Sequence, residues 1–300
     1  MDELRFDGRV AVVTGAGRGI GRCHALLLAA RGAKVVVADY GGQIDGGGAS
    51  AAPAELVVKE IAAAGGDAVA SFASVAEEDG AAAIVQTALD AFGRLDIVIN
   101  NAGISDKAPF MDLPSEKFRR MVDVHFLGTL YVTKAAWPHL VDAGAGRVVN
   151  TTSEAVLGTL PQLTSYASAK GAVLALTKSL AGEAAGTGIR VNAVAPRART
   201  RMSEGGKEAY PAGSELRRRV EAHLARLDPE LISPAAAYLA HESCRINGEA
   251  LVVGGGAVHR LTLAVSKGIA RDGLTVEDVA AGLDEILDMT DATIPTAGRS

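Results

Sequence analysis

A tyrosine and a lysine four residues apart, Tyr166 and Lys170, are the side chains whose types and spacing most plainly suggest chemistry. In a helix this spacing places both side chains on one face. Free tyrosine has a pKa of roughly 10, too high for a base at neutral pH, but a neighbouring ammonium group favours the phenolate and lowers that pKa. The pair therefore predicts a group that exchanges a proton with a carbinol oxygen. The alternative is a surface tyrosine that lies over a lysine stem.

Ser153 lies thirteen residues before Tyr166, at the end of an apolar run that predicts a strand. A serine at the end of a strand is by itself most often a cap or turn residue. Here Ser153, Tyr166 and Lys170 are all expected beyond the same edge of one sheet, and that convergence favours a catalytic role. We expect the Ser153 hydroxyl to hold the substrate oxygen beside the phenol.

A glycine-rich segment, Thr14 to Gly21, follows the first apolar run of the chain. Glycines let the backbone turn sharply and approach a pyrophosphate closely, and the helix that begins there offers unpaired N–H groups to phosphate oxygens. An ordinary tight turn is the alternative, but the position at the first strand–helix junction favours nucleotide binding. The candidate binding residues in this segment are Gly15, Arg18, Gly19, Ile20 and Gly21.

Asp39 ends the second predicted strand, eighteen residues after Gly21. A carboxylate at this position accepts hydrogen bonds from the adenosine ribose hydroxyls and repels a 2′-phosphate. It predicts NAD rather than NADP as cofactor, unless Asp39 is only a turn or capping residue. Arg18 is a complication, because a basic side chain there is able to hold a 2′-phosphate; we give Asp39 the greater weight.

Short apolar runs alternate with helical patterns along the chain, and these elements must position the polar groups. Seven strands are expected, at about residues 10–13, 34–39, 67–72, 95–99, 147–150, 189–194 and 250–253. Helices are expected between them, among them long ones over about 115–142 and 165–185. Continuous apolar strands separated by helices indicate a parallel sheet covered on both faces. The sequence therefore predicts an α/β, doubly wound parallel sheet (a Rossmann fold), with ligands beyond the carboxyl ends of the strands.

Two segments fit this alternation poorly. Residues 197–215, which include Gly205, Gly206 and Pro211, predict a substrate loop. Residues 257–300 predict a tail with one helix, over about 275–289, packed on the same domain as residues 1–256. We therefore expect a single Rossmann-type domain with a C-terminal tail.

Composition excludes several classes of protein. The net charge is -5, and no basic stripe favours nucleic acid or an anionic membrane surface. No apolar run approaches the roughly 20 residues that cross a bilayer. The two cysteines lie far apart and form no CxxC pair, which indicates a reduced, cytoplasmic protein without a disulfide framework. We expect a small-molecule substrate and no metal site.

Taken together, these residues resemble the short-chain dehydrogenase/reductase family over about residues 8–256. The resemblance is carried by the Thr14–Gly21 segment, Asn100-Asn101-Ala102-Gly103, Ser153, Tyr166 and Lys170, in the order and spacing of the family. It implies that Tyr166 is the acid/base, that Lys170 binds the nicotinamide ribose and tunes Tyr166, and that Ser153 orients the substrate carbonyl. It also implies cofactor contacts from Asn101, Ala102 and Gly103, and a homodimer or homotetramer.

Four positions deserve comparison with the family pattern. His125 stands where the family commonly has an asparagine in a proton relay; histidine also relays protons, but a helix-packed histidine is the even alternative. Ser74-Val75 replaces an aspartate that meets the adenine amine, so only the serine or the backbone is able to serve. Pro196-Arg197 replaces a Pro-Gly pair, while Thr200 matches the threonine that holds the carboxamide.

A narrower resemblance is to the (3R)-hydroxyacyl-CoA dehydrogenase domains of peroxisomal type 2 multifunctional enzymes. It rests on the glycine-rich extension from Asp39 to Gly48, on His125 and on the tail after Gly256. It implies oxidation of 3-hydroxyacyl-CoA thioesters with NAD, or of steroids as in some relatives, by a stand-alone version of the domain. Another alcohol or sugar dehydrogenase of the same family, or an inactive NAD-binding module, are the alternatives; the intact Ser153, Tyr166 and Lys170 argue against the module.

Overall fold

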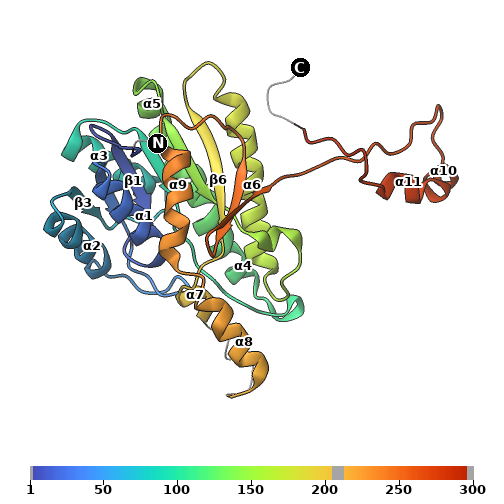
Figure 1. Ribbon diagram of the computed structural model, residues 1–300, viewed down its shortest axis with the longest axis horizontal. Coiled ribbons are helices and arrows are strands. Elements are labelled where there is room, and N and C mark those ends of the chain that lie inside the picture. The colour runs from blue at the N-terminus through green and yellow to red at the C-terminus, as the bar shows by residue number, and fades with distance from the viewer. Residues whose placement is uncertain (1–2, 205–212, 296–300) are drawn as a thin grey trace.

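An eight-stranded sheet forms the centre of the computed structural model, which describes residues 3–204 and 213–295 (Figure 1). The strands are β1 (Val10–Thr14), β2 (Lys34–Ala38), β3 (Asp67–Ser71), β4 (Ile97–Asn100), β5 (Arg147–Thr151), β6 (Arg190–Pro196), β7 (Ala250–Gly254) and β8 (Ala257–Leu261). Their order across the sheet is β3-β2-β1-β4-β5-β6-β7-β8, and β1 to β7 are parallel. This is the order of a doubly wound sheet, which confirms the predicted Rossmann-type fold.

The strand β8 adds an antiparallel edge that the sequence prediction omits. It pairs with β7 from Gly254↔Ala257 to Ala250↔Leu261. Gly255 and Gly256 join the two strands with φ of 58° and 80°, the left-handed conformation that a tight two-residue hairpin turn needs at both positions. Residues 257–261 therefore belong to the sheet and not to the tail.

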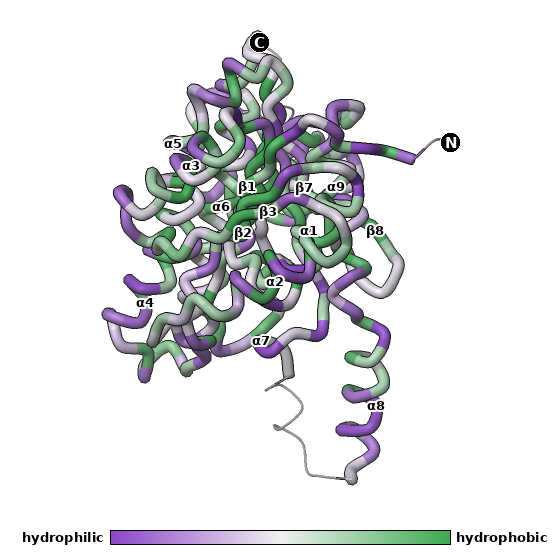
Figure 2. The backbone as a smooth tube through the Cα atoms, turned by 90° about the vertical axis from the view of Figure 1, so that its left-hand side faces the viewer, coloured by the Kyte–Doolittle hydropathy of each residue, from purple (hydrophilic) through white to green (hydrophobic). Residues whose placement is uncertain are grey.

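Helices cover both faces of the sheet and enclose two layers of core. The α-helices of the described residues, including those outside these two layers, are α1 (Gly19–Ala30), α2 (Ala52–Ala63), α3 (Glu78–Phe92), α4 (Ser115–Val122), α5 (Gly128–Asp142), α6 (Thr164–Glu183), α7 (Arg201–Glu204), α8 (Glu215–Leu224), α9 (Ser233–Ala240), α10 (Val276–Ala281) and α11 (Leu283–Leu287). Alternate residues of the apolar strands face opposite layers: Ala11 and Val13 pack with α1, α2 and α9, whereas Val10 and Val12 pack with α3, α5 and α6. Figure 2 shows the resulting apolar centre.

The helix expected over residues 115–142 is divided by a π-helical turn, Asp123–Leu127, into α4 and α5. Hydropathy patterns do not reveal such a turn, because it changes the winding of the helix over only a few residues. π-Turns inside helices occur frequently at functional sites, and this one contains His125.

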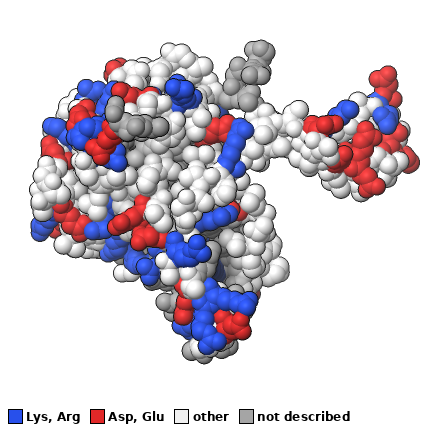
Figure 3. All heavy atoms as spheres, viewed as in Figure 1, with Lys and Arg blue, Asp and Glu red and all other residues white. Residues whose placement is uncertain are grey.

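The tail differs from the expectation of one helix packed on the domain. After β8 it extends away from the body (Figure 1), a bridge between Val265 and Thr293 closes its outer loop, and α10 and α11 contain no buried residue. The helical pattern is interrupted at Gly282, so two short helices replace the one expected. Acidic side chains gather on this outer part of the tail (Figure 3).

The expected substrate loop, 197–215, is described in part. It begins with an extended stretch and α7, and α8 begins at its last residue, Glu215. Gly205, Gly206 and Pro211 lie outside the described residues. Across residues 3–204 and 213–295, no helix has both the length and the apolar character needed to span a bilayer.

Candidate active site

A cavity of about 1000 Å³ opens beyond the carboxyl ends of the parallel strands, where the chain turns from β1 to α1 and from β4 into the loop after it. At this point the connection that follows β1 and the connection that follows β4 run to opposite sides of the sheet. This is the usual position of a ligand in doubly wound folds. Every residue predicted for the site lines the cavity: Gly15, Arg18, Gly19, Ile20, Gly21, Asp39, Ser74, Val75, Asn101, Ala102, Gly103, His125, Ser153, Tyr166, Lys170, Pro196 and Thr200.

The glycine-rich turn forms one wall of the cavity, and its backbone segments lie close to one another. Gly15 and Gly19 have φ of 65° and 53°, and a Cβ atom on Gly21 would lie 2.2 Å from the Gly15 carbonyl oxygen. The first turn of α1 has no side-chain cap and no acidic residue, so its free N–H groups remain available to an anion. These features fit the pyrophosphate of a dinucleotide.

Asp39 connects two backbone segments at the nucleotide side of the cavity through hydrogen bonds. One of its carboxylate oxygens accepts a hydrogen bond from the Gly17 N–H at 2.7 Å, and the other accepts one from the Gly41 N–H at 2.7 Å. Each oxygen keeps lone-pair capacity for a ribose hydroxyl. Arg18 instead extends along the following loop and donates to the Gly42 carbonyl at 3.3 Å.

The loop after β4 is hydrogen-bonded to the glycine-rich turn through Thr14. The Thr14 hydroxyl accepts from the N–H groups of Asn101 and Ala102 at 3.0 and 3.1 Å, and the Asn101 side chain donates back to the Thr14 and Gly15 carbonyls at 2.9 and 3.2 Å. Thr14 is a positioning residue that the sequence prediction did not single out. Its place at the end of the first strand was the available signal.

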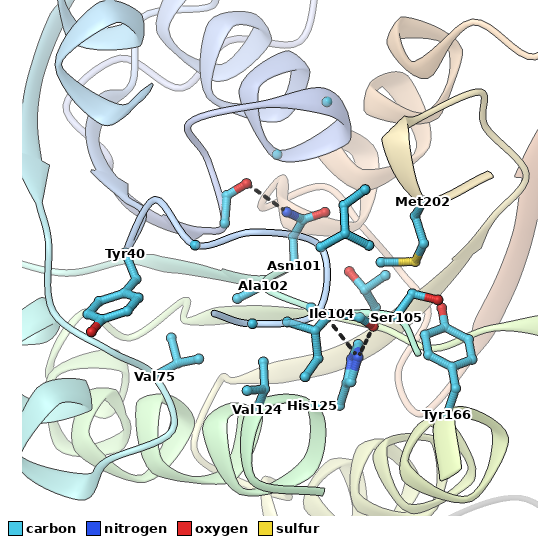
Figure 4. A pocket seen from close by; sticks show the side chains of 18 of the residues that line it. Tyr40, Val75, Asn101, Ala102, Ile104, Ser105, Val124, His125, Tyr166 and Met202 are labelled. Atoms are coloured by element: carbon cyan, nitrogen blue, oxygen red, sulfur yellow. Dashed lines mark hydrogen bonds between the residues drawn. The ribbon is translucent and has the colours of Figure 1, made fainter. Parts of the chain in front are cut away.

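Figure 4 shows that the cavity is elongated, with Tyr40 and Val75 toward one end and Tyr166 and Met202 toward the other. At the first end Ser74 is engaged locally, since its hydroxyl accepts the Ala76 N–H at 3.2 Å. The second end combines the predicted catalytic groups with apolar side chains, Leu160, Leu163 and Met202. The arrangement fits a nucleotide at one end and a largely apolar substrate at the other.

Tyr166 and Lys170 lie on one face of α6, as their spacing predicts. Lys170 is only 3% exposed, its Nζ donates to the Thr151 carbonyl at 2.6 Å and lies 5.8 Å from the Tyr166 ring centroid. Burial lowers the pKa of Lys170 to about 7. Because this pKa is close to neutral pH and the hydrogen-bond partner is an uncharged carbonyl, the Lys170 side chain gains or loses a proton near neutral pH.

The pKa of Tyr166 differs from the sequence expectation. Burial raises it above the ordinary value of tyrosine, and the hydrogen bond with Ser153 opposes this rise without overcoming it. Removal of the phenolate from water therefore outweighs its favourable neighbours in the protein alone. Ser153 is the neighbour that lowers the pKa of Tyr166, a role that the sequence assigned to Lys170.

Ser153 is fixed at the point where β5 ends. Its hydroxyl accepts the Ala155 N–H at 3.1 Å and so caps a short 3-10 turn, Glu154–Leu157. The hydroxyl is thus a cap, which is the predicted alternative, and its O–H proton is still available to a second partner in the cavity.

His125 lies against Tyr166 at the floor of the cavity. Its ring is 1% exposed, its Nε2 is 2.8 Å from the Ile104 carbonyl oxygen and 3.1 Å from the Ile104 nitrogen, and its Nδ1 has no hydrogen-bond partner among the described residues. Burial, and secondarily the charge of Lys170, holds the pKa of His125 well below its usual range. Gly103 leaves space for the ring, since a Cβ there would lie 2.5 Å from His125 Cε1.

Three cavity residues with clear roles were not anticipated. Thr151 holds Lys170 through its carbonyl, one backbone group of Ile104 hydrogen-bonds to His125 Nε2, and Tyr40 lines the nucleotide end. Backbone contacts of this kind leave no side-chain pattern in a sequence. In the part of the chain that the structure describes, no group of three or more His, Cys, Asp or Glu side chains is arranged to hold a metal ion.

Comparison with known proteins gives a consistent result. The sequence model of a family described as short chain dehydrogenase matches residues 9–209. A short-chain type dehydrogenase/reductase of Mycobacterium tuberculosis is 45% identical over 95% of this chain and 96% of its own length. Peroxisomal multifunctional enzyme type 2 of Drosophila melanogaster is 39% identical over 97% of this chain, which spans only 47% of that enzyme.

Solved structures agree with the sequence comparisons. The full-length Drosophila enzyme superposes with a TM-score of 0.77, at 31% identity, over 97% of this chain and 47% of its own. A 7α-hydroxysteroid dehydrogenase complexed with NADH and 7-oxo glycochenodeoxycholic acid superposes with a TM-score of 0.73, at 31% identity, over 85% of this chain and 98% of its own.

Proposed function

Since the chain belongs to the short-chain dehydrogenase/reductase family, and is therefore an oxidoreductase, we propose that it uses NAD to interconvert a secondary alcohol and a ketone. The substrate we propose is a 3-hydroxyacyl-CoA thioester or a steroid-type molecule. The observation that carries the proposal is the convergence of Ser153, Tyr166 and Lys170 on one cavity whose other end is a glycine-rich turn.

Each of the three side chains has a distinct part in this chemistry. In the oxidative direction, the Tyr166 phenolate takes the proton of the substrate hydroxyl, and the Ser153 hydroxyl hydrogen-bonds to the same oxygen. The bound nicotinamide supplies the acceptor for the hydride that leaves the carbinol carbon. Lys170, held by the Thr151 carbonyl and 5.8 Å from the Tyr166 ring centroid, would hold the nicotinamide ribose of the bound cofactor. Reduction of the ketone runs through the same groups in reverse.

His125 is proposed as a proton relay behind Tyr166. The support is its neutral, buried ring with an unpartnered Nδ1 in a cavity that also contains Lys170. An unsatisfied buried nitrogen is costly unless water or another group meets it. A water molecule at Nδ1 would remove that cost and provide the path by which the proton leaves the site.

The choice of NAD rests on Asp39. Its carboxylate is fixed at the nucleotide end of the cavity, and the neighbouring Arg18 is turned onto the Gly42 carbonyl. A 2′-phosphate would meet the Asp39 charge directly. Turnover with NAD and NADP at matched concentrations tests this choice, and a preference for NADP would contradict it.

The choice of substrate rests on two relatives: one is named as a peroxisomal multifunctional enzyme, and the other holds an oxidised bile acid. The first experiment is reduced-nicotinamide formation with (3R)-3-hydroxyacyl-CoA thioesters, hydroxysteroids and simple alcohols side by side. Turnover confined to alcohols or sugars would favour the alternative dehydrogenase. NAD binding without turnover of any substrate would favour the inactive NAD-binding module.

Assembly and location are also proposed by analogy with the family. We expect a homodimer or homotetramer, which light scattering at several protein concentrations tests. We expect a cytoplasmic location; because several relatives are named as peroxisomal enzymes, cell fractionation against both compartments is the appropriate measurement.

A further inference from the structure

An ion pair joins the two chain segments that frame the catalytic end of the cavity. Glu154 directly follows Ser153, and Arg197 directly follows Pro196. The Arg197 guanidinium donates from Nε and Nη2 to the two carboxylate oxygens of Glu154, each at 2.5 Å. Ser153 and Pro196 line the cavity, whereas neither member of the pair does.

The pair lies where the regular pairing of β5 with β6 ends. The last paired residues are Thr151 and Val194, followed by one further bond from the Thr152 N–H to the Val194 carbonyl at 2.8 Å. Beyond that bond the next contact between the two segments given by the side chains is the Glu154–Arg197 pair. It thus continues the β5–β6 connection as far as the catalytic serine.

Arg197 is held in place by its own backbone and by the next strand. Its N–H donates to the Val253 carbonyl at 2.7 Å, and a Cβ on Gly254 would lie 2.5 Å from Arg197 Cβ. The guanidinium hydrogen bond holds the pKa of Glu154 below its usual range, so the carboxylate is charged at neutral pH. A smaller electrostatic contribution from His259 on β8 lowers the pKa of Glu154 in the same direction.

Stability alone does not explain this arrangement. The Arg197 side chain is 47% exposed, and exposed ion pairs contribute at most about 1 kcal/mol. A bidentate pair does, however, fix orientation more strictly than a single contact. The pair orients Glu154, the first residue of the turn that Ser153 caps, and in this way it sets the direction of the Ser153 hydroxyl.

We propose that Glu154 and Arg197 are positioning residues that hold the Ser153 hydroxyl in place at the wall of the cavity that it shares with Tyr166. The inference rests on the proposed function only in taking Tyr166 as the acid/base.

The test measures Tyr166 directly, whatever the substrate. The chain has five tyrosines, so NMR titration of protein labelled at the tyrosine ring carbons, with Tyr166 assigned by its loss in Tyr166→Phe, reports the pKa of this phenol. Ser153 lowers that pKa, so Glu154→Gln should raise it. With an active substrate, kcat should fall on the order of tenfold and its pH profile should move to higher pH, while the Kd for NAD stays unchanged.

A double-mutant cycle and a matched pair make the test specific. Arg197→Gln should give the same shift as Glu154→Gln, and the double variant should be no worse than either single variant. Arg260 on β8 and Glu249, which immediately precedes β7, form a similar bidentate pair at 2.7 and 2.8 Å, and neither residue lines the cavity. Glu249→Gln should leave Tyr166 unchanged.

Two results would overturn the inference: an unaltered Tyr166 titration in Glu154→Gln, or an equal shift in Glu249→Gln. Additive effects in the cycle would do the same, because independent contributions mean that the two residues do not act as a pair. Failure of the wild-type protein to turn over any substrate would instead count against the proposed function, and the titration would still decide this inference.

Discussion

The ring of His125 meets the ring of Tyr166 edge to face, with centroids 5.2 Å apart and planes at 89°. The contact joins two elements that lie far apart in the sequence, the π-helical turn of residues 123–127 and the first turn of α6. It depends on Gly103, because a Cβ at this position would lie 2.5 Å from His125 Cε1.

Replacement of Gly103 by alanine should therefore disturb the catalytic end of the cavity. The new Cβ would push the His125 ring toward Tyr166, and overpacking of this kind costs about 1–3 kcal/mol. We expect a lower Tm and a lower kcat. Gly171 on α6 is the matched control, because a Cβ there meets nothing within 4 Å and alanine favours a helix. Equal effects of the two substitutions would contradict this account.

Removal of the Tyr166 hydroxyl should abolish most of the turnover without weakening cofactor binding. General acid–base catalysis contributes about 10²–10⁴-fold, so Tyr166→Phe should lower kcat at least a hundredfold. NAD affinity, measured by calorimetry, should change little, because the phenol acts on the substrate oxygen. Wild-type turnover in this variant would exclude tyrosine from the mechanism.

The buried Lys170 should make the protein more stable as the pH rises from 7 to 9. Its folded pKa is about 7, below that of an unfolded lysine, so the unfolded chain binds more protons throughout this interval. The free energy of unfolding should rise by at most about 1.4 kcal/mol per pH unit from this group. Urea denaturation of wild type and Lys170→Met at several pH values measures the difference. Parallel curves would show that Lys170 is not the source.

The buried His24 should make the protein less stable as the pH falls from 6.5 toward 4. Burial lowers its folded pKa to about 4, and its Nδ1 already bonds to the Ser233 hydroxyl at 2.9 Å. Protons are then taken up mainly by the unfolded chain, which favours unfolding. His24→Gln should flatten this part of the stability curve, whereas the exposed His259→Gln should not. A curve that keeps its slope in His24→Gln would point to other groups.

Replacement of Asp39 by serine should shift the cofactor preference toward NADP. The substitution removes the charge that repels a 2′-phosphate, and Arg18 is close enough to reorient toward it. We expect the ratio of kcat/KM for NADP to that for NAD to rise on the order of tenfold or more. NAD binding should also weaken, since the Asp39 carboxylate accepts hydrogen bonds from the backbone N–H groups of Gly17 and Gly41. An unchanged ratio would show that specificity lies elsewhere.

Much of this site was predictable because its positions follow from the fold. The apolar runs and the Thr14–Gly21 segment predict a parallel sheet with a nucleotide turn, and the carboxyl ends of parallel strands necessarily meet at one edge. Side chains at strand ends, such as Asp39 and Ser153, must therefore face one cavity. The four-residue spacing of Tyr166 and Lys170 places them on one helix face for the same geometric reason.

The remaining features depend on contacts between segments far apart in the chain. The π-helical turn that presents His125, the raised pKa of Tyr166 and the partnership of Glu154 with Arg197 all arise from packing and desolvation. The order of the amino acids specifies which groups are present and which elements carry them. The protonation and the partners of these groups follow from the folded arrangement, because both depend on how much water and which neighbours the folded chain leaves around each group.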